Sequence, residues 1–147
     1  LLDRFGLSVE VRTPQDLDER VQVIKRRDAF ERDPDAFRQA YAADNQALRQ
    51  HILKARKQLD KVQANDDLLR TCAALCQKLG TDGLRAELTL MRASRAYAAL
   101  QGKKAVTTAH LRQVAPMALR HRLRRNPLDD TGSGIRVERA LAEVLGA

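Results

Sequence analysis

The feature that most constrains this chain is the recurrence of helix start and stop signals along its length. Thr13-Pro14 and Asp33-Pro34 each place a capping side chain before a proline, a residue suited to the first helical position. Glycine is the residue type suited to a left-handed helix C-cap. Further start and stop signals follow at Asn65 or Asp66, Gly80, Gly102 and Thr107. A chain punctuated in this way is expected to form a succession of helices.

Apolar residues recur at helical spacing inside each of the expected segments. The first helix is expected from Pro14 to about Glu31, and Pro116 is expected to kink a later one because proline removes a backbone hydrogen bond. A turn is expected over residues 126–134, before a last short helix. The residues expected on buried helix faces are Leu17, Val21, Ile24, Leu69, Cys72, Leu75, Cys76, Leu79, Leu84, Leu88, Met91, Ala98, Leu100, Leu111, Val114, Ala118, Leu123, Ile135, Leu141 and Val144.

The longest periodic segment follows Asp33-Pro34 and carries a narrow apolar seam between charged positions. The seam consists of Phe37, Tyr41, Leu48, Ile52, Ala55, Leu59 and Val62. A continuous helix of roughly 28 residues would extend about 40 Å at 1.5 Å per residue. Because the seam is narrow, this helix or helix pair is expected to project from the rest of the fold or to lean along it.

The N-terminal stretch differs from the rest, since Leu7, Val9 and Val11 alternate at the period of a strand. Elsewhere the composition favours helices. Aromatic residues make up 3% of the chain and tryptophan is absent, so the core must be aliphatic. The expected fold class is therefore mainly α, a helical bundle preceded by one short strand.

The chain is basic, with a formal net charge of +8 at pH 7. Its densest basic patch is "RHRLRR", residues 120–125, and such a patch can neutralise nucleic-acid phosphates. No stacking aromatic residues, glycine-rich RNA-binding signature or zinc-finger spacing accompany it. A solvated helix end or a subunit contact is the favoured interpretation, while a nucleic-acid-dependent motor and a non-enzymatic basic helical adaptor remain alternatives.

Several site types are not supported by the residues present. Cys72 and Cys76 lack a second cysteine pair or nearby histidines, so they are interpreted as buried thiols in the cytoplasm, and no metal site is expected. The sequence contains no apolar run of the roughly 18 residues that span a bilayer. The paired acids Asp66-Asp67 and Asp129-Asp130 suit helix caps or turns. Neither a phosphate-binding loop nor a catalytic triad can be assembled, so no complete active site is expected in this chain.

Five stretches, in order, resemble the ATPase subunit of magnesium chelatase and its cobaltochelatase relatives, AAA+ proteins that drive metal insertion into tetrapyrroles. They are "LLDRFGLSVEVRTPQDLDERVQVIKRR", "FERDPDAFRQAY", "DGLRAELTLMRASRAYAALQG", "AVTTAHLRQVAPMALRHRLRRNPLD" and "GSGIRVERALAEVL". The resemblance implies a C-terminal fragment with four parts. These are the end of the α/β core, including the strand (1–12), a connecting helix (13–31), a long helical insertion (32–64) and the helical lid (65–147).

The resemblance also implies functional residues. Arg4 in "LLDRF" falls at the arginine finger, which acts on a neighbouring subunit's nucleotide, and Arg85 in "DGLR" falls at sensor two. Whether Arg85 acts within its own subunit or across the ring stays open. ATP and Mg²⁺ would be bound mainly by the part of the protein upstream of Leu1, so this fragment alone is predicted to be inactive.

The implied assembly is a ring, usually a hexamer, in the bacterial cytoplasm without membrane insertion. Its expected partners are a second AAA+ chelatase subunit and a large porphyrin- or corrin-binding subunit. The implied reaction is ATP-dependent insertion of magnesium into protoporphyrin IX, for chlorophyll, or of cobalt into a corrin, for cobalamin, and nucleic acid is not expected as a partner.

Overall fold

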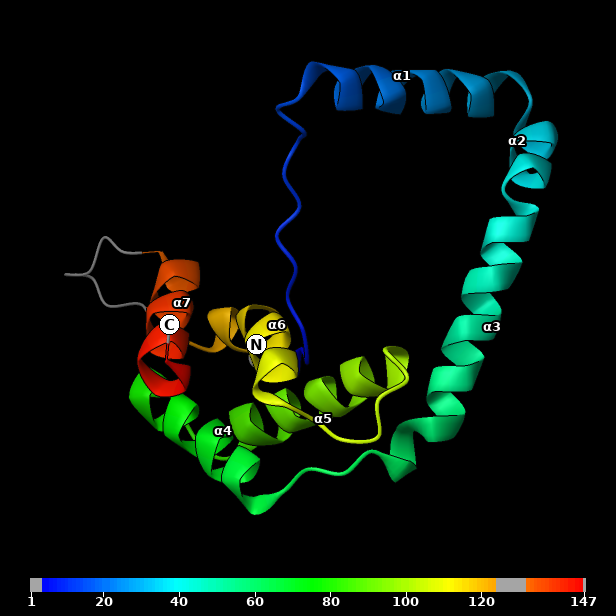
Figure 1. Ribbon diagram of the computed structural model, residues 1–147. Helices are drawn as coiled ribbons and strands as arrows, with labels where there is room; N and C mark the ends of the chain where they lie inside the picture. The colour runs from blue at the N-terminus through cyan, green and yellow to red at the C-terminus, as the bar shows by residue number, and fades with distance from the viewer. Residues whose placement is uncertain (1–3, 124–131, 147) are drawn as a thin grey trace. The chain divides into compact units, whose positions relative to one another are not determined.

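The computed structural model describes residues 4–123 and 132–146 and is mainly helical (Figure 1). Its elements are α1 (Leu17–Arg32), α2 (Pro34–Ala40), α3 (Ala42–Gln58), η2 (Leu59–Lys61), α4 (Asp66–Leu79), α5 (Arg85–Leu100), α6 (Thr108–Leu119), η3 (Arg120–Arg122) and α7 (Ser133–Leu145). They form two compact units. We call Glu10–Leu53 the small unit, and Leu1–Val9 with Lys54–Ala147 the large unit. The helical fold class expected from the sequence is confirmed.

The large unit is a bundle of α4, α5, α6 and α7 around one aliphatic core. Each of the four helices contributes side chains that solvent does not reach. Fully burying one leucine stabilises a fold by about 1.5–3 kcal/mol. The largest fully buried side chains are Leu75, Leu90, Leu111, Leu119, Val137, Cys76 and Ser94.

The helix ends in the large unit follow the sequence signals closely. Asn65 caps α4, since its side chain accepts a hydrogen bond from the Leu68 backbone N–H at 3.0 Å. Gly80 ends the same helix in the left-handed conformation, with φ of 65°, which an L side chain adopts only with strain. Thr107 is the N-cap of α6, and its backbone N–H donates to Nδ1 of His110 at 2.8 Å. These three expected helix boundaries are confirmed.

The buried faces depart from the sequence expectation at several apolar positions. In α4, Leu68 is the buried leucine, and Leu69 is 43% exposed. In α5 the buried face is lined by Ala86 and Leu90 together with Met91, Ser94, Ala98 and Ala99. Leu84 and Leu88 are 73% and 55% exposed, Leu100 is 37% exposed, and Ile135 of α7 is exposed while Val137 is buried. Small residues allow close helix packing, so α5 buries its alanine-rich face and leaves Leu88 and Leu100 outside the core.

The small unit contains α1, α2 and the first part of α3, and the connections between them are lined by aromatic rings. Phe37 packs edge-on against Phe30, with 5.6 Å between the ring centroids, and its ring is tilted against that of Tyr41, with 4.8 Å between the centroids. Neither α1 nor α2 contains a buried residue, so the expected burial of Leu17, Val21 and Ile24 is wrong for this structure. Because no side chain of α1 or α2 is buried, tertiary packing contributes little to the stability of these two helices.

One expected boundary in the small unit is also corrected. The N-cap of α1 is Asp16, whose side chain accepts from the Glu19 N–H at 2.9 Å, so the helix starts after Thr13 and Pro14 rather than at them. Asp33 caps α2 with Pro34 as the first helical residue, as expected. The long segment, expected as a helix or a helix pair, is a pair, because Tyr41 separates α2 from α3.

The short strand expected over residues 7–11 is not found. A strand needs a partner for its backbone hydrogen bonds, and within the described residues the only β-type pairing is an isolated bridge between Gln63 and Ala105. The segment instead has irregular backbone, and the Ser8 N–H donates to the Met117 carbonyl at 2.8 Å. No helix in the described part of the chain is both long enough and apolar enough to cross a membrane. Residues 126–131 of the expected turn lie outside the described residues.

Candidate functional site

Arg85, the first residue of α5, lies at a helix start that lacks a side-chain cap. The N-cap position is Leu84, whose side chain accepts no hydrogen bond, whereas Asp16, Asp33 and Asn65 cap other helices through theirs. Uncapped backbone N–H groups at a helix start carry partial positive charge. The Arg85 side chain is exposed and adds a full positive charge there. This helix start is therefore electrostatically suited to an anion.

A cavity of about 210 Å³ adjoins this helix start. It is lined by Thr81 and Asp82 from the α4–α5 connection, Ala86 from α5, and His121 and Arg122 from η3. Arg122 brings a guanidinium group, whose fixed donors match phosphate oxygens. The cavity can hold a phosphate-sized group rather than a whole nucleotide.

The short helix η3 also binds the N-terminal segment. The carbonyl of Phe5 accepts hydrogen bonds from His121 Nε2 at 2.9 Å and from Arg122 Nη2 at 2.8 Å. Nε2 must carry a proton here, because a carbonyl oxygen cannot donate. Arg122 Nε also donates to the Ala118 carbonyl at 2.9 Å. The two side chains that line the cavity thus hold the residue that follows Arg4.

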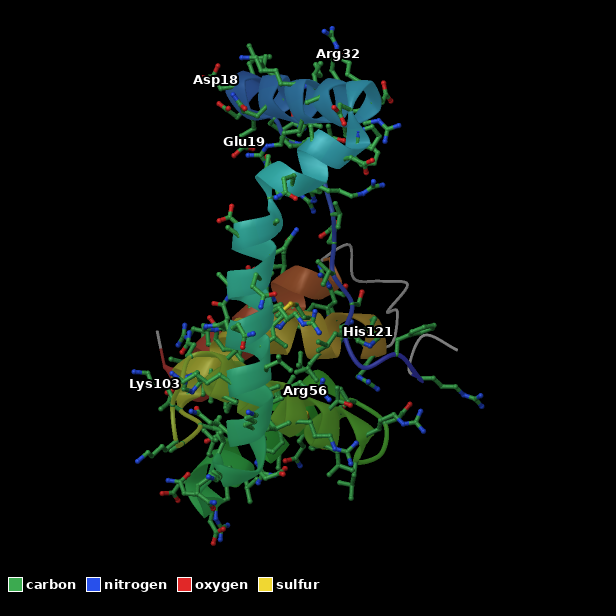
Figure 2. The ribbon with its side chains drawn as sticks, turned by 90° about the vertical axis from the view of Figure 1, so that its right-hand side faces the viewer. Asp18, Glu19, Arg32, Arg56, Lys103 and His121 are labelled. Atoms are coloured by element: carbon green, nitrogen blue, oxygen red, sulfur yellow. The ribbon has the colours of Figure 1, made fainter. Side chains whose placement is uncertain are left out.

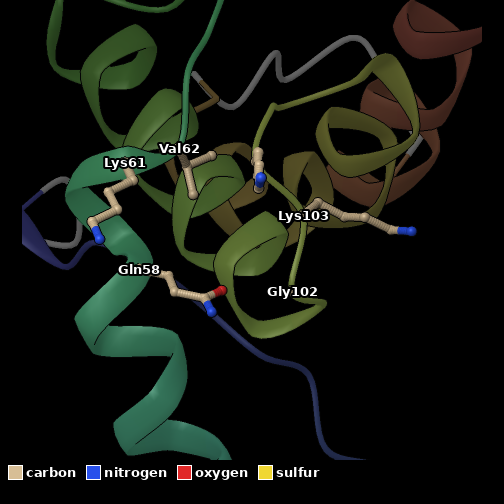
Figure 3. A pocket seen from close by; sticks show the side chains of 6 residues that line it. Gln58, Lys61, Val62, Gly102 and Lys103 are labelled. Carbon is tan, nitrogen blue, oxygen red and sulfur yellow. The ribbon is translucent and has the colours of Figure 1, made fainter.

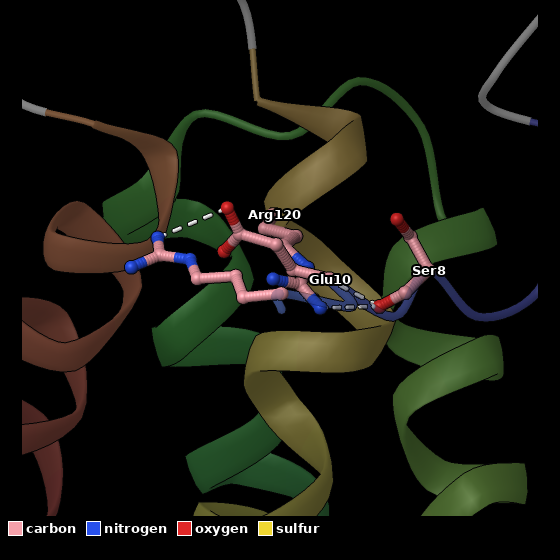
Figure 4. Close-up of polar contacts among 4 residues, drawn as sticks. Ser8, Glu10 and Arg120 are labelled. Carbon is pink, nitrogen blue, oxygen red and sulfur yellow. Dashed lines mark hydrogen bonds and ion pairs between the residues drawn. The ribbon is translucent and has the colours of Figure 1, made fainter. Parts of the chain in front are cut away.

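A second contact holds the N-terminal segment at Ser8, three residues after Phe5. Arg120 donates to the Ser8 carbonyl from Nη2 at 2.8 Å and from Nε at 3.2 Å (Figure 4). The Ser8 N–H in turn donates to the Met117 carbonyl at the end of α6. Residues 5–8 are therefore bound at both ends to the α6–η3 corner.

These contacts correct the interpretation of the basic patch at residues 120–125. Arg120 and Arg122 bind backbone carbonyls of the same chain, so a wholly solvated helix end is wrong for them. Arg124 and Arg125 lie outside the described residues. The density of positive charge could be seen in the sequence, but its hydrogen-bond partners could not, because every residue has a backbone carbonyl.

Arg4 and Arg85, the two predicted site residues, belong to neighbouring parts of the large unit. Arg4 is exposed and directly precedes Phe5, and Arg85 directly precedes Ala86. Phe5 is bound by the same two side chains that line the cavity beside Ala86. The structure therefore connects the two predicted residues through η3.

The chemistry of the site fits phosphate better than metal. Within residues 4–123 and 132–146, no three histidine, cysteine or acidic side chains group together as metal ligands would. Cys72 and Cys76 are buried, and burial, followed by the charge of Glu87, raises the thiol pKa to about 11 for Cys72 and about 12 for Cys76. Such thiols stay protonated near neutral pH and are poor metal ligands. The cavity beside α5 therefore offers the cationic donor Arg122 together with the acid Asp82, and among the described residues it holds no cluster of metal ligands.

A second cavity of about 440 Å³ lies on the other side of the large unit. Figure 2 shows His121 and Lys103 on opposite sides of this bundle. The second cavity is lined by Gln58, Lys61, Val62, Gly102, Lys103 and Lys104. Figure 3 shows the side chains of Lys61 and Lys103 pointing away from each other, so they do not converge on a common ligand.

Comparison with protein families assigns the helical bundle. The family described as AAA lid domain matches residues 69–143, just over half of the chain. The chain belongs to the AAA lid domain family. The matched residues include most of α4 and all of α5, α6 and η3, and therefore Arg85 and every residue that lines the 210 Å³ cavity.

Comparison with curated proteins confirms the resemblance to magnesium-chelatase subunits. The chain is 60% identical over 142 residues to the magnesium-chelatase 38 kDa subunit of Acidiphilium rubrum, an alignment covering 97% of this chain and 41% of that protein. It is 59% identical to the subunit of the same name from Cereibacter sphaeroides, over 99% of this chain and 43% of the relative. The magnesium-chelatase 38 kDa subunit of Rhodobacter capsulatus is 55% identical, over 99% of this chain and 41% of that protein. The chain thus spans about two fifths of the length of these relatives.

Proposed function

We propose that the chain is the lid-bearing part of an AAA+ ATPase motor subunit of a magnesium chelatase. In the whole protein, ATP hydrolysis would drive insertion of magnesium into protoporphyrin IX. The observation that carries this proposal is the 60% identity to a magnesium-chelatase subunit over 97% of the chain. Because the names of the closely similar relatives specify magnesium, we favour it over cobalt and a corrin substrate.

Arg4 is proposed as the arginine finger, acting on the nucleotide of a neighbouring subunit. Phosphoryl transfer spreads negative charge over the γ-phosphate oxygens, and a guanidinium group stabilises that charge with paired donors. The exposed position of Arg4 supports this role, since a finger must reach beyond its own subunit.

Arg85 is proposed as the sensor-two residue. Its position at an uncapped helix start, beside a cavity lined by Arg122 and His121, supports contact with a terminal phosphate. Loss of that phosphate would remove the charge that Arg85 binds and bias the position of the lid.

The remaining functions are proposed to belong to other parts of the assembly. The nucleotide and Mg²⁺ would be held mainly by residues outside this chain, so the 147-residue chain alone is predicted not to hydrolyse ATP. The working form would be a ring, with a hexamer expected, acting in the cytoplasm with a second AAA+ subunit and a large porphyrin-binding subunit.

The test is the Arg4→Ala variant of the full-length protein, with Arg12→Ala as the matched control. Arg12 is an exposed arginine nearby in sequence whose guanidinium pairs with Glu10 at 3.0 Å. We expect Arg4→Ala to lower the kcat for ATP hydrolysis by about 10³-fold with unchanged nucleotide affinity, because the finger acts in the transition state. Magnesium-protoporphyrin formation with the partner subunits should fall in parallel.

Arg12→Ala should keep the wild-type kcat. A wild-type kcat in Arg4→Ala would overturn the finger assignment. Full ATP hydrolysis without any magnesium insertion, in the presence of both partner subunits, would overturn the chelatase assignment while leaving the motor intact.

A further inference from the structure

The segment after Arg4 is held to the large unit through its backbone. The side chains of Phe5 and Leu7 are 60% and 51% exposed, so apolar burial contributes little to its position. The hydrogen bonds of Arg120, His121 and Arg122 to the Phe5 and Ser8 carbonyls hold it instead. Hydrogen bonds from charged donors are stronger than neutral ones and have stricter geometry.

Two of these three residues connect this segment to the cavity beside Arg85. His121 and Arg122 line that cavity while they bind Phe5, whereas Arg120 binds Ser8 without lining the cavity. A displacement of η3 would therefore move residues 5–8, and Arg4 directly precedes them.

We propose that Arg120 and Arg122 are positioning residues that fasten the Arg4 segment to the lid, so that the finger moves with the lid. This inference rests on the proposed function, since it requires Arg4 to be the finger. Through η3, a change at the Arg85 side of the lid alters where Arg4 is presented to the neighbouring subunit. The finger's position then depends on the nucleotide bound at the lid.

The test uses the full-length protein with Arg120→Ala, because Arg120 holds the segment without lining the cavity. The matched control is Arg112→Ala. Arg112, in α6, also donates to a backbone carbonyl, but to that of Gly146 at 2.7 Å and not to one of residues 5–8. We expect Arg120→Ala to lower the kcat for ATP hydrolysis about tenfold with unchanged affinity for a non-hydrolysable ATP analogue. Arg112→Ala should keep the wild-type kcat.

Two further readouts separate positioning from general loss of structure. Amide hydrogen exchange of the peptide containing Ser8 should rise in Arg120→Ala and not in Arg112→Ala, while the α5 peptides stay protected in both. In the double variant Arg4→Ala/Arg120→Ala, kcat should equal that of Arg4→Ala alone, because Arg120 acts through Arg4.

Each contrary result has a distinct meaning. If the kcat losses of Arg4→Ala and Arg120→Ala multiply in the double variant, the positioning role is overturned and the finger assignment stands. The same holds if Arg120→Ala and Arg122→Ala both keep the wild-type kcat while Arg4→Ala is impaired. A wild-type kcat in Arg4→Ala would overturn the finger assignment, and with it the catalytic meaning of the anchor. Unchanged exchange at Ser8 in Arg120→Ala would show that the anchor does not hold the segment.

Discussion

At the scale of single residues, the function proposed here depends on the shape of guanidinium groups as well as on their charge. Arg120 engages one carbonyl through two of its nitrogens, and the proposed roles of Arg4 and Arg85 require paired donors to phosphate oxygens. Lysine carries the same charge on a single ammonium group and cannot reproduce this planar arrangement. An arginine with such a role should therefore not tolerate lysine.

Arg85→Lys tests this distinction. We expect the variant to lose about tenfold in the kcat for ATP hydrolysis by the full-length protein, because a single donor replaces a fork at the phosphate. Arg92→Lys is the control, since Arg92 is an exposed arginine two turns further along α5. Steady-state ATPase assays of both variants measure this difference, and equal, wild-type activity in both would overturn the sensor-two assignment of Arg85.

At the scale of helices, the start and stop signals specify boundaries more reliably than the apolar pattern specifies faces. Caps act through local bonds between neighbouring residues, so Asn65 and Gly80 could be recognised from sequence alone. Which face is buried depends on the neighbouring helix. Leu68 rather than Leu69 points inward, and α5 presents alanines where leucines were expected. The contact between η3 and Phe5 could not be predicted, because it joins residues more than a hundred positions apart through a backbone atom.

Gly80→Ala tests the cap on α4. At both Gly80 and Gly134 an added Cβ would meet no atom within 4 Å, but only Gly80 has a positive φ, of 65°. We expect Gly80→Ala to destabilise the fold by about 1–2 kcal/mol, since a left-handed backbone strains any L side chain. Gly134→Ala, at the start of α7, should be neutral or slightly stabilising. Urea unfolding of both variants measures the difference, and equal effects would contradict the conformational explanation.

The buried thiols of α4 predict a loss of stability at alkaline pH. Burial raises the pKa of Cys72 to about 11 and of Cys76 to about 12, from 9.0 for a free thiol. Below pH 9 both thiols are protonated whether the chain is folded or not. Above it the unfolded chain releases protons that the folded chain retains, so the free energy of unfolding falls with rising pH.

Between about pH 8 and about pH 10.5, the free energy of unfolding measured in urea should therefore fall more for the wild type than for Cys72→Ala/Cys76→Ala, since only the wild type carries the thiols. The double variant is expected to be less stable at both pH values because it leaves small cavities, but that loss does not depend on pH. An identical pH dependence in the two proteins would contradict the prediction.

At the scale of the whole molecule, the two units differ in how they are stabilised. The large unit has a continuous aliphatic core, whereas α1 and α2 of the small unit bury no residue. The small unit is stabilised by contacts between residues close in sequence. They are the helix caps of Asp16 and Asp33, ion pairs such as Arg27 with Glu31, and the contacts among the rings of Phe30, Phe37 and Tyr41. Exposed ion pairs contribute little, about 0–1 kcal/mol each.

In the isolated 147-residue chain, backbone amides of α1 and α2 should therefore exchange with solvent at least about 100-fold faster than those of α5. Hydrogen exchange followed by mass spectrometry measures this directly. Its internal control is α4, which should be protected like α5 because Leu75 and Cys76 lie in the same core. In the full-length protein, α1 should gain protection if its exposed apolar residues, such as Leu17 and Ile24, pack against residues outside this chain. Equal protection of α1 and α5 in the isolated chain would show that the small unit has a stability the observed contacts do not explain.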